Sequence, residues 1–307
     1  MRSTRTSSTP IIGFIGFGEA AFGIAKGLTG EGVGRISAYD INSESAGPGP
    51  RINRRARDAG VRLLACSKEL ATASDILFSA VTADAAWQAA IQTAPFLESR
   101  HTYVDLNSIS PELKRSVGEL VSSCGSRFVE AAIMSPVTPH GHRVPIFLSG
   151  AHAAALIETL GPYGMKLEAI SEQIGAASAA KMCRSIVVKG MEALVLESLL
   201  AAVPYGVDEL VLGTLNESFP GLDWPRLASY MIGRVVEHGQ RRARELEEAT
   251  TTLRCLGIEP IMAEAAARRQ DWCAQLNLLA KFGGQAPGDY REVVKTITQE
   301  CEAVSKA

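Results

Sequence analysis

The sequence predicts an α/β protein with two domains, a doubly wound parallel sheet at the N-terminus and an all-helical domain at the C-terminus. Three observations support this fold class. A glycine-rich strand–turn–helix pattern opens the chain at residues 11–28. Short apolar runs then alternate with helical periods as far as residue 150, and from residue 151 onward the period is almost wholly helical. A chain of 307 residues can bury a core in each of two domains.

The opening pattern is typical of a dinucleotide-binding turn. An apolar run at residues 11–15 predicts a buried strand, which Gly16-x-Gly18-x-x-Ala21 joins to a helix. Glycine at 16 permits a sharp turn, glycine at 18 lets a pyrophosphate approach the backbone, and a small residue at 21 lets the helix pack on the strand. The helix start offers free N–H groups to phosphate. We predict cofactor contacts from the turn residues Gly16, Phe17, Gly18, Glu19, Ala20 and Ala21.

An acidic residue ends the second predicted strand, residues 35–40. Asp40 follows Gly18 at close to the ~20 residues expected of a carboxylate that binds a ribose diol. The same carboxylate would repel a 2′-phosphate, so we predict NAD, with NADP the less favoured cofactor. Three arginines of a helix predicted at residues 51–59, Arg51, Arg54 and Arg55, could clamp a 2′-phosphate if the Gly/Pro-rich loop before them were compact. We expect that loop to be flexible.

Further apolar runs complete the predicted sheet, at residues 61–64, 75–81, 102–106, 128–133 and 145–148, with helices at 83–94 and 110–122. Polar residues follow two of these runs, Val81-Thr82 after one and Asn107-Ser108 after another. Because the carboxyl ends of such strands face the ligand crevice, we predict that these four residues contact the cofactor. The alternative is that they only form turns. No convincing strand is found after about residue 170.

The helical half is dominated by residues 175–202, a stretch without proline that would form a helix roughly 42 Å long joining the two domains. Further helices are expected at 207–219, 225–256, 259–279 and 289–304. The predicted organisation is a disordered tail at 1–10, a dinucleotide-binding domain at 11–170 and a helical substrate and dimerisation domain at 171–307.

The bulk composition is that of a globular protein, 46% hydrophobic and 21% charged, and its net charge of −2 argues against nucleic acid or an anionic membrane as partner. Without a long apolar run or a signal-peptide core, the sequence predicts a soluble cytoplasmic protein. The six cysteines lack C-x-x-C and Cys/His ligand spacing, so we expect reduced, buried thiols and no metal site.

Lys181 is the candidate catalytic base. It lies near the start of a helix rich in small and apolar residues, where lysine is unusual. Ser185 and Lys189 follow one and two turns later on the same side. Spacing alone leaves two interpretations open, a catalytic group with polar neighbours, or a surface stripe or salt-bridged interior lysine.

Three stretches, taken in order, resemble the β-hydroxyacid dehydrogenase family, which includes 3-hydroxyisobutyrate and 6-phosphogluconate dehydrogenases. They are the turn at residues 13–28, Val104-Asp105-Leu106-Asn107-Ser108-Ile109-Ser110-Pro111, and Gly175 to Lys181. The resemblance extends over nearly the whole chain. It implies a Rossmann domain, a helical second domain that interlocks in a homodimer, and a lysine acid/base group. The matching lysine is Lys181.

Two stretches depart from the family pattern. Ser185, preceded by Arg184, stands where the family usually has Asn. The substrate-carboxylate loop, usually Asp-Ala-Pro-Val-Ser-Gly-Gly, is Glu130-Ala131-Ala132-Ile133-Met134-Ser135-Pro136 here. The departures, together with residues 238–245 and 257–260, resemble a divergent, phosphogluconate-dehydrogenase-like branch of the family. We predict substrate contacts from Met134, Ser135, His140, Arg184, Ser185, Lys189 and Arg241.

Two groups of polar residues have alternative explanations. His238, Arg241, Arg242 and Glu245 share one helix face, either as an intrahelical ion-pair cluster or as an anion site. His140 and His142 lie in a Gly/Pro loop and lack further metal ligands, so we expect contact with substrate rather than a metal.

The predicted function is an NAD(P)-dependent dehydrogenase that oxidises the hydroxyl of a small 3-hydroxy acid, with Lys181 accepting the hydroxyl proton. The sequence does not decide whether the 3-keto acid then loses CO₂, nor which substrate is used. An imine reductase on the same scaffold is an alternative that the retained lysine disfavours. A non-catalytic nucleotide sensor is another.

Overall fold

The computed structural model describes residues 9–306, and the side chains of residues 9–302. The chain forms two compact units, of which the first ends at Lys181 and the second begins at Met182. The prediction placed the boundary at residue 170, whereas the structure places it inside a helix. The predicted disordered tail lies outside the described residues except for Thr9 and Pro10, and Pro10 is buried.

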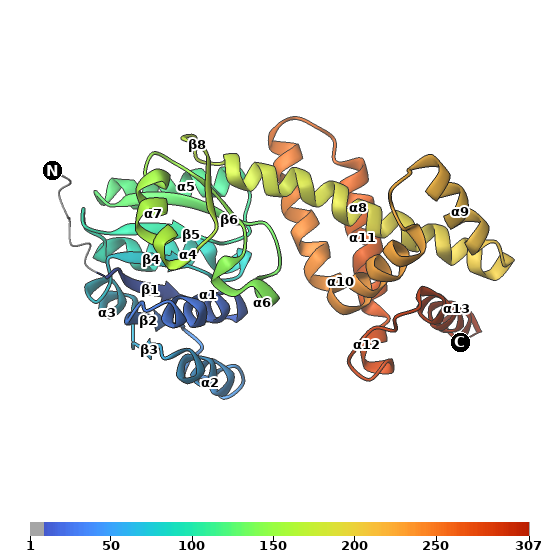
Figure 1. Ribbon diagram of the computed structural model, residues 1–307, viewed down its shortest axis with the longest axis horizontal. Coiled ribbons are helices and arrows are strands. Elements are labelled where there is room, and N and C mark those ends of the chain that lie inside the picture. Colours follow the sequence, from blue (N-terminus) through green and yellow to red (C-terminus); the bar gives the residue numbers. More distant parts are fainter. Residues whose placement is uncertain (1–8, 307) are drawn as a thin grey trace. The chain divides into compact units, whose positions relative to one another are not determined.

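The first unit is built on an eight-stranded sheet in the order β3-β2-β1-β4-β5-β6-β7-β8, with all neighbours parallel except β6 and β7. Figure 1 shows the central strands between helices. The strands are β1 (Ile11–Ile15), β2 (Arg35–Tyr39), β3 (Arg62–Leu63), β4 (Ile76–Ser79), β5 (Thr102–Asp105), β6 (Arg127–Ile133), β7 (Ile146–Ser149) and β8 (Leu167–Ser171). The predicted fold class is confirmed.

Two features of the sheet differ from the prediction. The pair β6–β7 is antiparallel, so the sheet is not wholly parallel. Strand β8 falls in a region interpreted as helical, because its middle residues are exposed and it lacks the apolar run that marks a buried strand. As an edge strand it pairs only with β7.

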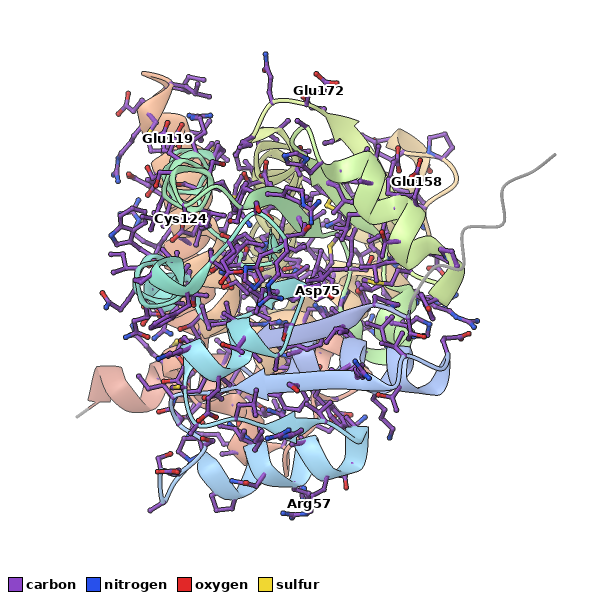
Figure 2. The ribbon with its side chains drawn as sticks, turned by 90° about the vertical axis from the view of Figure 1, so that its left-hand side faces the viewer. Arg57, Asp75, Glu119, Cys124, Glu158 and Glu172 are labelled. Atoms are coloured by element: carbon purple, nitrogen blue, oxygen red, sulfur yellow. The ribbon has the colours of Figure 1, made fainter. Side chains whose placement is uncertain are left out.

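Helices cover both faces of this sheet. On one face α1, α2 and α7 bury a cluster that includes Phe14 and Phe78, whose rings stack 5.3 Å apart. On the other face α3, α4 and α5 cover Tyr103 and Phe128. Figure 2 shows α5, marked by Glu119 and followed by Cys124, and α7, marked by Glu158, on opposite sides of the sheet. The helices are α1 (Glu19–Gly30), α2 (Gly49–Ala59), α3 (Ser67–Thr72), α4 (Ala86–Thr93), α5 (Pro111–Ser123), α6 (Val137–His140) and α7 (Ala153–Leu160), with 3-10 turns η1 (Ala83–Ala85), η2 (Ala94–Phe96), η3 (Gly141–Arg143) and η4 (Gly161–Tyr163).

The rest of the described chain is helical. The helices are α8 (Ala176–Tyr205), α9 (Asp208–Ser218), α10 (Trp224–Cys255), α11 (Ile261–Gln275), α12 (Leu278–Lys281) and α13 (Tyr290–Lys306). In the second unit α10 and α11 lie side by side (Figure 1). The helix expected at 259–279 is divided because Asn277 adopts a left-handed conformation, φ 49°.

Two expectations from composition can be compared with the structure. Cys273 is buried, but Cys183, Cys255 and Cys301 are exposed, so the expectation of buried thiols is wrong for these three. Among residues 9–306, no helix is long and apolar enough to cross a bilayer.

Candidate functional site

The glycine-rich turn lies at the carboxyl end of β1, beside the chain that leaves β4. Gly16 has φ +82°, and a Cβ on it would lie 2.7 Å from the carbonyl oxygen of Ala80 and 2.7 Å from Cγ1 of Val81. Both the backbone conformation and the contact require glycine. The turn and the chain after β4 are therefore packed against each other, which brings two predicted cofactor segments together.

The start of α1 is open. A Cβ on Gly18 would meet no atom within 4 Å, and no side chain in the described part of the molecule caps this helix end. Its first N–H groups and its positive dipole end are thus available to a phosphate. Glu19 is exposed beside them, whereas Ala21 is fully buried against the sheet, as the fingerprint predicts. This cradle fits the pyrophosphate of a dinucleotide.

Asp40 holds the turn in place. Its Oδ2 accepts a hydrogen bond of 2.7 Å from the backbone N–H of Phe17, and its Oδ1 accepts one of 2.9 Å from the N–H of Asn42. Phe17 itself has a fully buried side chain. Sequence reasoning assigned Asp40 to the ribose alone. The structure adds a second role, since the carboxylate also fixes the loop that would carry the phosphates.

The loop after Asp40 is compact, which corrects the expectation of flexibility. Successive backbone bonds run from Ser43 N–H to the Asp40 carbonyl and from Ser45 N–H to the Asn42 carbonyl. The side chain of Asn53 then donates 2.7 Å to the carbonyl of Ser43, tying the loop to α2. The exposed arginines of α2, among them Arg51 and Arg54, are consequently held at a fixed place. A clamp of these arginines on the 2′-phosphate of NADP is therefore an alternative to recognition of NAD by Asp40.

Asn107 braces the neighbouring strand ends. Its Oδ1 accepts the N–H of Val81 at 2.8 Å, and its Nδ2 donates to Oγ of Ser79 at 2.9 Å. The Asn107 side chain therefore links the ends of β4 and β5, and its contact with a cofactor stays a prediction. Thr82 is exposed, and Ser108 has a buried hydroxyl without a hydrogen-bond partner in the described structure.

A buried ion pair supports the same strand ends, and sequence reasoning missed it. Lys114 donates to Oδ1 of Asp105 at 3.0 Å and to the Asp105 carbonyl at 2.7 Å, and both side chains are buried. The pair joins α5 to the end of β5. A sequence signal existed, because Lys114 falls on the apolar stripe of α5 with Val117 and Val121.

The segment that follows β6 contains the predicted substrate residues Met134, Ser135 and His140. Met134 and Ser135 are half-buried at the end of the strand, and Met134 donates its N–H to the Pro145 carbonyl at 2.9 Å. His140 is exposed. Nothing in these contacts fixes a substrate role, which stays a prediction.

His142 packs against α1. A Cβ on Gly27 would lie 1.9 Å from its Nδ1, so the imidazole occupies the place of a side chain there, and a Cβ on Gly23 would lie 2.6 Å from Cγ1 of Val137. Burial lowers the pKa of His142, although the carboxylate of Glu31 opposes the shift. The residue is therefore a packing group of the sheet unit.

The first turn of α8 is bound to the sheet. Glu130, fully buried on β6, accepts hydrogen bonds from the N–H groups of Gly175 at 2.5 Å and Ser178 at 2.6 Å. Oγ of Ser149 accepts the N–H of Ala177 at 3.0 Å. Lys181 lies about one turn further along and is half-buried. The candidate base thus belongs to the unit that carries the glycine-rich turn.

The other members of the predicted α8 stripe enter a buried polar cluster of the helical unit. Lys189 donates to Oγ of Ser185 at 2.8 Å and forms an ion pair of 2.9 Å with Glu245 of α10. Burial lowers the pKa of Lys189, while Glu245 acts in the opposite direction. Arg184, one residue before Ser185, is exposed.

Two ion pairs join the α10 face that contains Arg242 and Glu245 to α8. Arg242 forms a two-pronged, buried pair with Glu192 of α8, and Glu245 pairs with Lys189. Both ion pairs join two helices, so the intrahelical explanation is wrong for them. Arg242 is thus paired with Glu192. Arg241 is exposed, and its contact with an anion stays a prediction.

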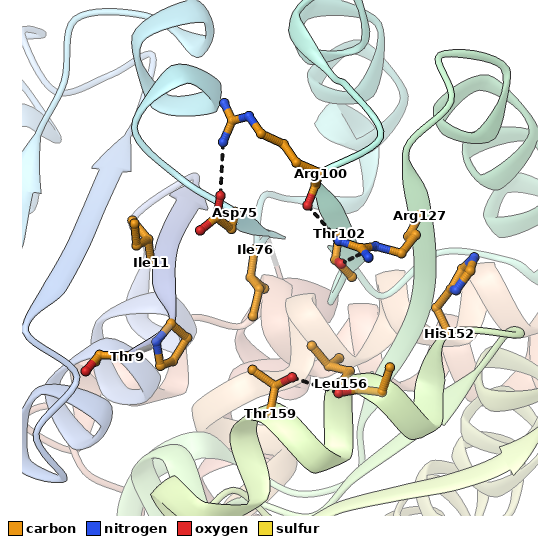
Figure 3. Close-up of a pocket in the computed structure, with 12 residues that line it drawn as sticks. Thr9, Ile11, Asp75, Ile76, Arg100, Thr102, Arg127, His152, Leu156 and Thr159 are labelled. Carbon is orange, nitrogen blue, oxygen red and sulfur yellow. Dashed lines mark hydrogen bonds and ion pairs between the residues drawn. The ribbon is translucent and has the colours of Figure 1, made fainter. Parts of the chain in front are cut away.

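A pocket of about 240 Å³ lies at the opposite edge of the sheet, where β1, β4, β5 and β6 begin (Figure 3). Arg100 is paired with Asp75 at 3.0 Å, and Arg127 donates to Oγ1 of Thr102 at 3.1 Å. This pocket is separate from the glycine-rich turn. No cluster of residues suited to a metal occurs in the described part of the chain.

Comparisons with known proteins agree with this geometry. Residues 11–108 match the family model for NADP oxidoreductase, coenzyme F420-dependent, and residues 202–273 match a domain of unknown function (DUF1932). A conserved hypothetical protein from Sinorhizobium meliloti 1021 is 36% identical, with 95% of this chain and 97% of that one covered and a TM-score of 0.78.

A second solved structure decides the family. The conserved protein MTH1747, of unknown function but described as structurally similar to 3-hydroxyacid dehydrogenases, is 33% identical, with 87% of this chain and 98% of that one covered and a TM-score of 0.71. The chain belongs to the β-hydroxyacid dehydrogenase family. The mitochondrial 3-hydroxyisobutyrate dehydrogenase of Drosophila melanogaster is a more distant relative, 26% identical over 69% of this chain and 64% of its own length. This β-hydroxyacid dehydrogenase family member is an NAD(P)-dependent oxidoreductase, as the sequence predicts.

Proposed function

We propose that this protein is an NAD-dependent dehydrogenase that oxidises the hydroxyl of a small 3-hydroxy acid, with Lys181 as the acid/base group. The observation that carries the proposal is a combination of two features in the sheet unit. It combines an open, uncapped α1 start behind Gly16 and Gly18 with a helix that brings Lys181 into the same unit. The 3-hydroxyacid dehydrogenase similarity of its relatives supports the substrate class.

The residues suited to the cofactor are the turn at Gly16 and Gly18, the start of α1, and Asp40. When bound, the nicotinamide supplies the hydride acceptor. The chain's own contribution is to accept the hydroxyl proton at Nζ of Lys181, and general-base catalysis of this kind contributes roughly 10²–10⁴-fold to the rate. Met134, Ser135, His140, Arg184, Ser185, Lys189 and Arg241 remain proposed substrate contacts, and loss of CO₂ from the product remains open to measurement.

A substrate panel tests the proposal. NADH formation is measured with 3-hydroxyisobutyrate, 3-hydroxypropionate, 3-hydroxybutyrate, L-serine and 6-phosphogluconate, and the reverse reaction is measured with a cyclic imine. Turnover of a 3-hydroxy acid supports the dehydrogenase, whereas imine reduction alone would favour the alternative reaction. Cofactor binding without turnover of any of these compounds would favour a sensor.

The lysine is tested separately. In Lys181→Met, kcat should fall by the ~10²–10⁴ expected for a lost general base, and the dissociation constant of NADH should stay within about threefold. Lys26→Met, which changes an exposed lysine of α1, is the matched control. Turnover near that of the wild type in Lys181→Met would refute the assignment.

We also propose a homodimer formed through the helical unit. Large apolar side chains are exposed there, among them Leu194 on α8 (56% exposed) and Leu210 on α9 (68% exposed). Burying such side chains is the usual reason for a large hydrophobic interface between subunits.

A further inference from the structure

The helices α1 and α8 start differently. The start of α1 is open and lacks a side-chain cap in the described structure, as a phosphate site requires. The start of α8 is occupied, because Glu130 and Ser149 accept the N–H groups of its first turn. The anion at the start of α8 is therefore the carboxylate of Glu130, a group of the protein itself.

Glu130 is unusual for its place in the chain. It is a charged residue in the continuously buried run of β6, with an exposed fraction of 0%. A buried carboxylate is costly unless hydrogen bonds satisfy it. Its two oxygens each accept one backbone N–H, from Gly175 at the helix start and from Ser178 in the first turn. The negative charge also faces the positive end of a long helix, which stabilises it further.

These hydrogen bonds affect the position of Lys181. Lys181 follows Ser178 by about one turn, so the N–H that Glu130 holds fixes the backbone just before the candidate base. The second N–H, that of Gly175, fixes the helix start, and two points define the direction in which α8 leaves the sheet. A shift of about 1 Å in a catalytic group can cost on the order of 10²-fold in rate.

We propose that Glu130 is a positioning residue for Lys181, acting through the first turn of α8. The inference rests on the proposed function, because it requires Lys181 to be the acid/base group. Glu130 is not expected to touch the substrate. Its carboxylate fixes the backbone that carries the Lys181 amine, and helix capping explains an acidic residue at this buried place in β6.

The principal test is Glu130→Gln, measured with 3-hydroxyisobutyrate or whichever panel member is oxidised fastest. Gln can accept only one of the two N–H groups and carries no charge. We expect kcat to fall at least tenfold, with the NADH dissociation constant changed less than twofold. The matched control is Val129→Ala, a buried neighbour on the same strand that packs in the opposite face's core. Its kcat should change less than twofold.

Two further measurements separate positioning from general destabilisation. Hydrogen exchange at the amides of Gly175 and Ser178 should become faster in Glu130→Gln and not in Val129→Ala. In a Lys181→Met background, Glu130→Gln should change the residual turnover less than threefold, because residues that act as a unit are not additive. Should Glu130→Gln fail to fold, Glu130→Asp replaces it, with an expected loss of at least threefold in kcat.

Unchanged kcat in Glu130→Gln, or an equal loss with and without Lys181, would overturn the inference. The proposed function fails by a different result, wild-type turnover in Lys181→Met. The exchange measurement needs no substrate, and unchanged exchange at both amides would remove the capping role itself.

Discussion

Cofactor choice provides the sharpest prediction, because Asp40 has one function in the structure and a second, predicted one, and different substitutions separate them. The carboxylate holds the N–H of Phe17 inside the turn and would face the ribose of a bound dinucleotide. Asp40→Ala removes both functions. Asp40→Asn keeps an oxygen that can accept the Phe17 N–H and removes the charge. Comparing the two variants distinguishes support of the turn from recognition of the cofactor.

The effect on stability follows from the hydrogen bonds. A hydrogen bond to a charged group contributes about 1.5–3 kcal/mol, and the Phe17 N–H would be left without its acceptor in Asp40→Ala. The Asn42 N–H is exposed, so water can replace the carboxylate there. For a domain of this size each kcal/mol corresponds to roughly 2–4 °C, so Tm should fall by about 3–12 °C in Asp40→Ala. In Asp40→Asn it should fall by less than about 2 °C.

The effect on cofactor choice follows from charge. Two unit charges about 5 Å apart interact by ~3 kcal/mol at an effective dielectric constant of ~20, and solvent and salt reduce this to about 1–2 kcal/mol at a half-exposed site. We therefore expect kcat/KM to favour NAD over NADP at least tenfold in the wild type, equivalent to ~1.4 kcal/mol. Asp40→Asn should lower that ratio about tenfold by relieving repulsion of the 2′-phosphate.

The assay is kcat/KM with each cofactor for wild type, Asp40→Asn and Asp40→Ala, together with thermal unfolding of each. A wild type that prefers NADP would refute the reasoning, and so would an unchanged ratio in Asp40→Asn. In either case the compact loop before α2 makes the arginine clamp the better explanation. Arg51→Gln would then be expected to weaken NADP selectively.

Three further predictions concern packing, acid stability and assembly. Gly27→Ala should destabilise the sheet unit by about 1–3 kcal/mol in denaturant unfolding, because its Cβ would meet the His142 ring. The control is Gly30→Ala on the same helix, whose Cβ meets nothing within 4 Å and which should be no less stable than the wild type. Equal stability of the two variants would contradict this reasoning. The hydrogen bond that the Tyr290 hydroxyl donates, and then the charge of Arg291, lower the pKa of Asp208 below 3.8. The contribution of Asp208 to the free energy of unfolding is therefore complete above that pH and is lost as the pH falls through the lower folded value. The stability difference between wild type and Asp208→Asn should accordingly shrink below about pH 4 in urea titrations, and a constant difference would remove the argument. Light scattering at micromolar concentration should give a dimer mass, which Leu194→Glu should reduce, and a monomeric wild type would end that proposal.

Local patterns explain the parts of the fold that the sequence predicts. The turn at Gly16 follows from a local pattern, because its φ of +82° favours glycine, although the close approach of Ala80 that also excludes a side chain comes from a distant segment. The start of α5 follows from Ser110 and Pro111, since the Ser110 hydroxyl accepts the N–H of Leu113 and proline is favoured in the first helical turn. The long helix α8 follows from an uninterrupted helical period, and its one proline, Pro204, falls in its last turn.

Other parts depend on contacts between segments distant in sequence. Strand β8 is exposed along its middle, so its composition gives no sign of burial, and only pairing with β7 defines it. The compact loop after Asp40 is fixed by Asn53, ten residues beyond Ser43, and a Gly/Pro-rich composition does not show such a bond. Lys114, Glu130 and Arg242 were each visible as charges within apolar periods. Such a charge predicts a buried partner but does not identify it.

The carboxyl edge of the sheet combines an expected anionic cofactor with acidic residues, and three of these are bound by donors of the protein, whereas Glu19 is exposed. Asp40 is bound by two backbone N–H groups, Asp105 by the Lys114 ammonium and the N–H of Asn107, and Glu130 by the first turn of α8. Each carboxylate is thus engaged by donors of the protein, which reduces its repulsion of a pyrophosphate. The donors left open by the described side chains are those at the start of α1, where the glycine fingerprint predicts the phosphates to lie. The acids therefore organise the loops around the cradle, while the cradle itself is made of backbone.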